Sequence, residues 1–369
     1  MRPFAFYEPD KKTKESKVKT KRKRVIWLDI AKGIAILSVV LYHTGFLPLQ
    51  KQLLPIITSY MLPIFCVIGG YTYTQQNNHI IFFKKKVKSL IIPYFVVGIL
   101  SYLIWFVLIS ISNYQIIKLN LQDQFIQFLL GKNLIFNGPL WFLATFFLAI
   151  IFFNFIFFFI KNRSIFFQVG LSFFLFIASY FINLKKIHYP YSFDLVLLMV
   201  SFFIMGNVIK NYWRRITKKY IIGSFFLLYI LLSFKNGIVD VYGRLYGNPI
   251  YFWLNAVFGS LLIMYFSYFI YKRKLKINII LEYLGKRSLF ILVTHWPIMQ
   301  WITYVLNSTG VLELINGKPE IASFSYYLPN KYIFTLIEIL LLVIYTIMPI
   351  LFVVMLDKSK KCVLTSVQV

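Results

Sequence analysis

Long apolar stretches separated by short polar or basic segments recur along the whole chain. Most of them approach the roughly 20 residues that a helix needs to cross the core of a bilayer. We therefore predict an all-α integral membrane protein, a bundle of about ten transmembrane helices. The predicted spans are 25–47, 53–74, 89–111, 139–160, 164–183, 193–210, 219–234, 250–271, 288–307 and 331–356.

Composition and charge agree with this pattern. Of the 369 residues, 59% are hydrophobic and 14% are charged, a balance that no soluble domain of this size could bury. The net charge of +28 would suit a nucleic-acid partner, but the basic residues lie in short clusters between spans. With the N-terminus inside, 30 of the 40 Lys and Arg residues fall in inner segments, 9 in outer loops and one, Lys32, inside the first span. This asymmetry predicts both termini in the cytoplasm and a multi-pass protein of the cell (inner) membrane, with no nucleic-acid partner.

The chain divides into a basic cytoplasmic arm (1–24), one transmembrane domain (25–356) and a cytoplasmic tail (357–369). The arm is expected to lie on anionic headgroups. Two connectors have helical patterns of their own: an outer segment at 120–139 and a short inner interfacial helix at 277–285. No cluster of His and Cys has the spacing of metal ligands, so we predict no metal site and no bound cofactor.

The first span carries polar residues that a membrane helix usually avoids: Asp29, Lys32 and His43. At 100° per residue they share one helix face, with His43 roughly 16 Å further along the axis than Lys32. A histidine is suited to proton transfer near neutral pH, so His43 is the candidate general base. The structural alternatives are a helix-packing role for His43, pairing of Asp29 with Arg24 or Lys32, and a Lys32 amine that reaches the headgroups.

The pattern R-x-x-x-L-D-x-x-K-G-I-A-I-L-x-V-V-x-x-H, from Arg24 to His43, resembles the first span of membrane acyltransferase family 3. The branch it resembles most includes the fucose 4-O-acetylase-like proteins. Three further segments resemble the same family in the same order: FFKKKVKSLIIPY (82–94), NGPLWFLATFF (137–147) and LGKRSLFILVTHWPI (284–298). The resemblance covers residues 24 to about 300.

The resemblance implies an O-acyltransferase that moves an acetyl or short acyl group from acyl-CoA to a sugar hydroxyl of an envelope polysaccharide or its lipid-linked precursor. His43 matches the essential histidine of the family. The donor acetyl-CoA is then a co-substrate, and Lys85 and Lys88 stand at the family's basic pair. Lysine binds phosphate as a point charge, without the bidentate fork of arginine, and ordinary positive-inside charge is the alternative role. Lys32 is a further donor-binding candidate.

Three more residues belong to the predicted site. Trp141 and Asn137 match the start of the fourth span and are candidates to bind the acceptor, although an interfacial Trp often serves only as an anchor. His295 lies about seven residues, or 10 Å, from the inner end of its span. We therefore expect His43 and His295 at different depths, with His295 lining the donor channel.

Asp29 and Arg24 are predicted to orient the first span. Glu338 is a buried carboxylate that would need a partner and would orient His43 as a catalytic carboxylate.

Two other functional classes remain open on sequence grounds. A transporter or flippase for polysaccharide intermediates would more often show internal repeats or paired broken helices, and we find no convincing case of either. A lipid-linked glycosyltransferase would usually carry an acidic residue in a large outer loop, but neither Asp123 nor Asp240 lies in a recognisable motif.

Overall fold

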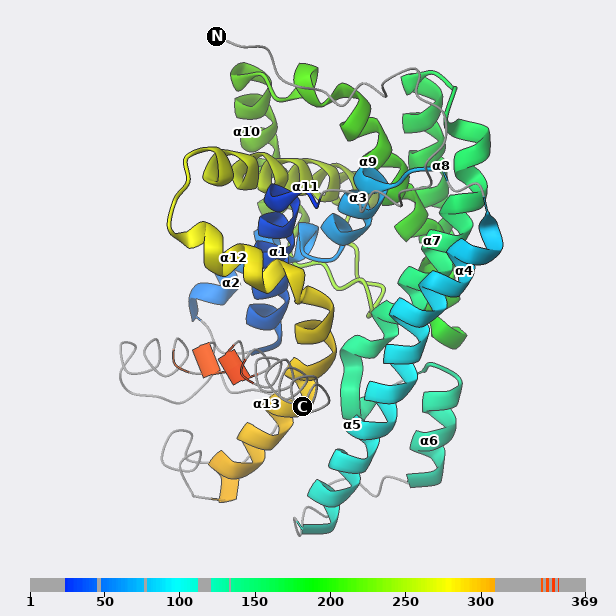
Figure 1. The fold of residues 1–369 in the computed structure, drawn as a ribbon, viewed down its shortest axis with the longest axis vertical. Coiled ribbons are helices and arrows are strands. Elements are labelled where there is room, and N and C mark those ends of the chain that lie inside the picture. The colour runs from blue at the N-terminus through cyan, green and yellow to red at the C-terminus, as the bar shows by residue number, and fades with distance from the viewer. Residues whose placement is uncertain are drawn as a thin grey trace, which may run out of the picture.

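The computed structural model describes residues 24–44, 48–75, 78–111, 121–132, 134–308 and a few positions between 340 and 351. The first half contains α1 (Ile26–Thr44), α2 (Pro48–Tyr60), α3 (Pro63–Thr72), α4 (His79–Lys86), η1 (Val87–Ile91), α5 (Ile92–Ile111), α6 (Leu121–Leu129), η2 (Ile135–Leu140) and α7 (Trp141–Ile160). The second half contains α8 (Ile165–Asn183), η3 (Pro190–Leu195), α9 (Val196–Ile216), α10 (Lys219–Asn236), α11 (Pro249–Lys272), α12 (Ile277–Lys286) and α13 (Ser288–Ser308). Figure 1 shows a helical assembly, and the described part of the chain has no strand beyond one isolated bridge.

Seven of the described helical stretches are long and apolar enough to cross a membrane, and they coincide with seven predicted spans. The all-helical membrane fold is therefore confirmed, whereas the count of ten remains a prediction. The stretches predicted at 219–234 and 288–307 form α10 and α13 but are not among these seven. Most of the stretch predicted at 331–356 lies outside the described residues. Large apolar side chains project outward from α5, α7 and α8, including Phe106, Phe155, Phe158, Phe166 and Phe174, as a lipid-facing surface requires.

Helix α9 is the most buried candidate span and contacts α3, α7 and α8. Two glycines allow α3 and α9 to pack closely. A Cβ atom at Gly70 would lie 1.9 Å from the carbonyl oxygen of Phe203, and one at Gly206 would lie 2.0 Å from that of Val67. The small residues bring the two backbones into direct contact, as is common in membrane bundles.

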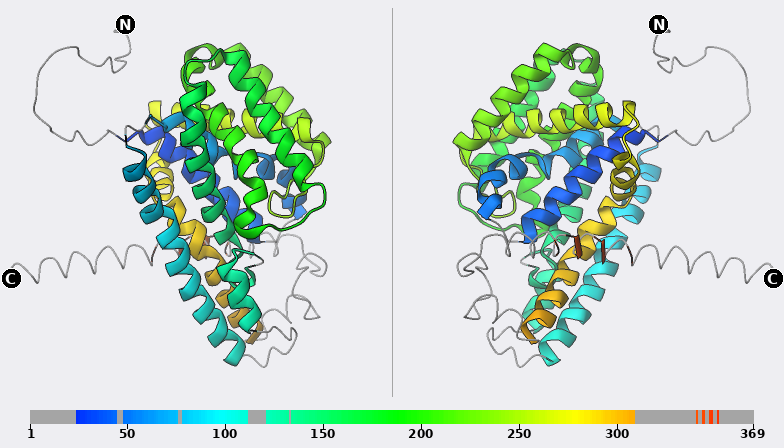
Figure 2. Two further views of the ribbon diagram at one scale, coloured as in Figure 1. Left: turned by 90° about the vertical axis from the view of Figure 1, so that its right-hand side faces the viewer. Right: turned by 90° about the vertical axis from the view of Figure 1, so that its left-hand side faces the viewer.

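A second pair of glycines positions α1. A Cβ atom at Gly33 would lie 2.1 Å from the carbonyl oxygen of Leu281, and one at Gly285 would lie 1.7 Å from that of Asp29. The predicted helix at 277–285 is thus present as α12, and it packs directly on α1. Helix α13 begins two residues after α12 ends and also contacts α1. In both views of Figure 2, α5 and α13 continue past the end of α1.

Candidate functional site

Two histidines meet between α1 and α13. His43, the next-to-last residue of α1, has its Nδ1 atom 3.1 Å from Nε2 of His295, and the ring centroids are 5.1 Å apart. His295 is fully buried. The edge of the Trp296 ring packs on His43, with centroids 5.3 Å apart. The expectation that the two histidines lie at different depths was therefore wrong.

The error has a geometric cause. The predicted depth of His295 was counted from the inner end of its own span, as if that end lay at the membrane surface. In the structure, α1 and α12 cross where Gly33 meets Leu281 and Gly285 meets Asp29. His43 follows Gly33 by ten residues and His295 follows Gly285 by ten residues. From this crossing, α1 continues for ten residues to His43, about 15 Å, whereas α13 starts at Ser288 and reaches His295 after seven residues, about 10 Å. The two paths meet at the histidine pair.

The hydrogen bonds of His295 define the protonation pattern of the pair. Its Nδ1 atom lies 2.9 Å from the carbonyl oxygen of Ile291, which can only accept. A neutral His295 therefore carries its proton on Nδ1 and a lone pair on Nε2. His43 must then donate from Nδ1 to that lone pair, which leaves the lone pair of His43 on its Nε2 atom. An imidazole in this tautomer can remove a proton from a hydroxyl group.

Pro297 and Asn137 together place the His295 turn of α13. Proline has no N–H, so the carbonyl of Val293 lacks the donor that residue 297 would normally provide. The side-chain amide of Asn137 replaces that donor, with Nδ2 2.7 Å from the Val293 oxygen and 2.9 Å from Ser101 Oγ. Asn137 is fully buried. The structure therefore gives this predicted acceptor-binding residue a clear packing role, and acceptor binding by Asn137 remains a prediction.

The charged residues at the start of α1 form one cluster. The Asp29 carboxylate accepts hydrogen bonds from Arg24 Nε at 2.5 Å and from Lys32 Nζ at 3.1 Å. Asp29 is 1% exposed, so the two cations compensate for burial of its charge. This is the pairing that the sequence offered as the structural alternative for Asp29. It fixes the amine of Lys32 at the edge of a cavity.

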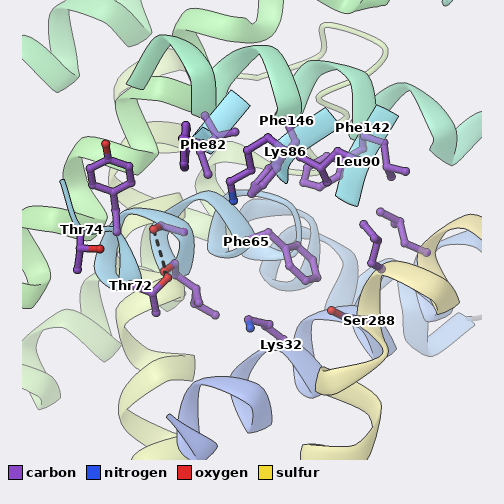
Figure 3. A pocket seen from close by; sticks show the side chains of 17 residues that line it. Lys32, Phe65, Thr72, Thr74, Phe82, Lys86, Leu90, Phe142, Phe146 and Ser288 are labelled. Atoms are coloured by element: carbon purple, nitrogen blue, oxygen red, sulfur yellow. Dashed lines mark hydrogen bonds between the residues drawn. The ribbon is translucent and has the colours of Figure 1, made fainter. Parts of the chain in front are cut away.

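That cavity, of about 390 Å³, lies between α1, α3, α4, α7 and the start of α13. Figure 3 shows Lys32 on one wall and Lys86 on the opposite wall, with Ser288 beside Lys32. Lys85 and Lys88, the predicted donor-binding pair, are exposed and do not line this cavity. From this basic cluster it is Lys86 that lines the cavity, and donor binding by Lys85 and Lys88 remains a prediction. The i, i+4, i+8 spacing of Phe82, Lys86 and Leu90, all of which line it, was the available signal.

Trp141 is buried rather than open to the cavity. Its ring packs on that of Tyr242 with centroids 5.3 Å apart, and His188 packs on the same tyrosine at 4.9 Å. Binding of a sugar by Trp141 therefore remains a prediction without support from its contacts. Tyr242 belongs to the loop between α10 and α11, which passes through the middle of Figure 1 between α1 and α7.

A buried ion pair that the sequence reasoning missed holds this loop. Arg244 and Asp194 have fully buried side chains, and the Nη2 atom of Arg244 lies 2.9 Å from Oδ2 and 3.0 Å from Oδ1 of Asp194. Arg244 also donates to Nδ1 of His188 at 2.6 Å. Burial, and then the Arg244 guanidinium, lower the pKa of His188, which keeps this histidine neutral and able to accept. The two partners of the ion pair are 50 residues apart, so no local pattern pointed to it.

Glu338, the predicted orienting carboxylate, lies outside the described residues. Within the part of the chain that is described, the side chain hydrogen-bonded to His43 is that of His295.

Comparison with known proteins gives one match. A family model described as an acyltransferase domain matches residues 25–358. Comparison with curated proteins and with solved structures finds no match.

Proposed function

Because the chain belongs to acyltransferase family 3, we propose that it transfers an acetyl or other short acyl group from acyl-CoA to a sugar hydroxyl. The acceptor in this proposal is a cell-envelope polysaccharide or its lipid-linked precursor. The observation that carries the proposal is the hydrogen bond between His43 and His295. It gives a membrane acyltransferase a candidate base with a defined tautomer.

In the proposed reaction, Nε2 of His43 removes the proton from the acceptor hydroxyl as its oxygen attacks the thioester carbonyl. The tetrahedral intermediate collapses, the C–S bond breaks, and protonated His43 returns the proton to the departing thiolate. The products are the sugar ester and free CoA, and His43 is again neutral. His295 acts as a positioning residue, because its lone pair holds His43 Nδ1–H and orients the ring.

The donor is proposed to occupy the cavity between Lys32 and Lys86. Two lysine amines on opposite walls suit the phosphate groups of CoA, and the volume of about 390 Å³ lies in the usual range for ligand sites. The cavity is also lined by Leu292, one helical turn before His295 on α13. A donor in this cavity would therefore approach the histidine pair along α13.

The test uses His43→Ala and, as a matched control, His79→Ala, which removes an exposed histidine that bonds Asn154. Envelope glycan from each strain is compared by proton NMR before and after mild base, which removes O-acetyl groups. We expect the O-acetyl signals to disappear in the His43→Ala strain and to persist in the control strain. Unchanged signals in the His43→Ala strain would refute the catalytic role. Loss of surface glycan with accumulation inside the cell would instead identify a transporter.

A further inference from the structure

A second cavity, of about 230 Å³, lies away from the donor cavity, between the end of α8 and the loop from α10 to α11. Its walls include Tyr180, Asn183 and Lys186 on the α8 side, and Arg244 and Tyr246 on the loop side. A single buried water needs about 10–15 Å³ of such space. The cavity is therefore large enough for a small organic group.

The loop side of this cavity is rigid. Asp240 and Leu245 form a short antiparallel bridge with two hydrogen bonds of 2.8 Å. Arg244, within this turn, adopts a left-handed conformation with φ of 56° and is held by its buried ion pair with Asp194. The side chain of Asn236 donates to the carbonyl oxygen of Tyr246 at 3.0 Å. A preformed wall of this kind binds a ligand with little ordering cost.

The α8 side presents an unsatisfied polar atom. Asn183 is 2% exposed, and its Nδ2 donates to Ser179 Oγ and to the Tyr246 hydroxyl, each at 3.2 Å. Its Oδ1 atom has no hydrogen-bond partner among the described residues. A buried amide oxygen left unpaired costs free energy, and a ligand hydroxyl that donates to it would remove that cost.

The hydrogen-bonding groups of the cavity suit a polyol. Asn183 Oδ1 accepts, whereas the Tyr246 hydroxyl, which already accepts from Asn183, can donate its own proton. Sugar hydroxyls both donate and accept, and the half-buried ring of Tyr180, whose centroid lies 6.2 Å from that of Tyr246, offers apolar surface to the C–H face of a pyranose. The charge of Arg244 is neutralised by Asp194, and the lining cation that remains is the exposed Lys186, whose amine donates hydrogen bonds to hydroxyl oxygens.

The same loop connects this cavity to the histidine pair. Leu245 and Tyr246 line the cavity on one arm of the turn, and Asp240, on the other arm, interacts electrostatically with Tyr42. Tyr42 precedes His43 and packs edge-on against it, with centroids 5.2 Å apart. A chain of sugars lying over this turn would therefore reach from the cavity to His43.

We propose that this cavity is an accessory glycan subsite, which binds one sugar of a polymeric acceptor while another sugar of the same chain is presented to His43. The inference rests on the proposed function and narrows it, since it favours a polymer over a single activated sugar as acceptor. It assigns the recognition of chain length to Asn183 and Lys186, away from the reacting atoms.

The test measures acceptor KM as a function of chain length with the full-length protein in nanodiscs. The probes are de-O-acetylated fragments of the host's own envelope glycan, from one to six sugars long, together with radiolabelled acetyl-CoA. The variants are Asn183→Leu and Lys186→Ala. Lys185→Ala is the matched control, because Lys185 is the adjacent exposed lysine and does not line the cavity.

We expect long fragments to have a lower KM than single sugars in the native protein and in the control. In both variants the ratio of the KM for single sugars to the KM for long fragments should fall by roughly 3- to 10-fold, because about one hydrogen bond is lost. The KM for acetyl-CoA should stay unchanged. The subsite would be refuted if Lys186→Ala had the same KM for long fragments as the native protein while Asn183→Leu either kept its KM as well or failed to fold.

A binding measurement without acetyl-CoA separates failure of the subsite from failure of the proposed function. Saturation-transfer NMR of the same fragments should show binding that weakens in both variants. Such binding without any transfer by the native protein would support the subsite and refute the transferase. Fragment binding that is the same in all variants would refute the subsite. Variants that weaken binding of phosphatidylglycerol but not of fragments would also refute it and would identify a lipid site instead.

Discussion

Replacement of Asn137 by alanine tests how the His295 turn of α13 is held. The amide of Asn137 supplies the donor that Pro297 cannot give to the Val293 carbonyl, and it also bonds Ser101. The variant loses both bonds and leaves the carbonyl unpaired in a buried position. A buried hydrogen bond contributes about 1 kcal/mol, an unpaired buried group costs about 1–3 kcal/mol, and bonds between membrane helices average about 0.6 kcal/mol. We therefore expect a loss of roughly 2 kcal/mol in the free energy of unfolding.

A second substitution shows whether the reasoning about Pro297 is right. Pro297→Ala restores an N–H at the position from which an α-helix normally bonds the Val293 carbonyl. In that background Asn137→Ala should cost about 1 kcal/mol less, because the carbonyl keeps a donor. The four proteins are compared by equilibrium unfolding in mixed detergent and SDS micelles, and the coupling is read from the double-mutant cycle. If Asn137→Ala costs the same in both backgrounds, the amide does not replace the missing proline donor.

Three further substitutions have expected outcomes that the structure fixes. Gly285→Ala should cost about 1–3 kcal/mol of stability and lower the melting temperature in detergent, because the added Cβ would overlap the α1 backbone. The control Gly170→Ala, with nothing within 4 Å of its Cβ, should leave the melting temperature unchanged or slightly raised. Equal effects of the two substitutions would refute the close crossing of α1 and α12. Asp194→Ala leaves a buried guanidinium unpaired and should cost about 3–5 kcal/mol in the same assay, so a melting temperature equal to that of the native protein would contradict burial of the pair. Lys86→Ala should raise the KM for acetyl-CoA roughly 10-fold, and Lys85→Ala should leave it unchanged. The reverse result would show that the donor binds at the exposed face of α4 rather than in the cavity.

The membrane fold could be predicted because hydropathy depends on local composition alone. Seven spans were located to within a few residues at most ends, although the stretch containing Lys86 begins ten residues earlier than expected. The helical path there includes the π turn η1, which shifts the phase of every residue that follows. A cluster of four lysines in five positions shows that a basic segment is present. It does not show which amine faces inward.

The arrangement of the site depended on contacts between distant segments. His43 was identified from its own span, but its partner was not, because the depth of His295 is set by the crossing of Gly33 and Gly285. The role of Asn137 likewise follows from a carbonyl 156 residues away. Both could have been suspected from sequence: two glycines each lie ten residues before a histidine, and a proline lies two residues after His295. Neither signal has a meaning until the helices are paired.

The most direct test of the central claim is a double-mutant cycle on the transfer rate. Native protein, His43→Ala, His295→Ala and the double variant are reconstituted in nanodiscs, and kcat is measured with radiolabelled acetyl-CoA and glycan acceptor. Loss of a general base typically costs about 10²- to 10⁴-fold, and residues that act as one unit are not additive. We predict that His43→Ala and the double variant are equally impaired, with His295→Ala losing most of the same activity. Losses that multiply in the double variant, or a His43→Ala protein with native kcat, would contradict the account.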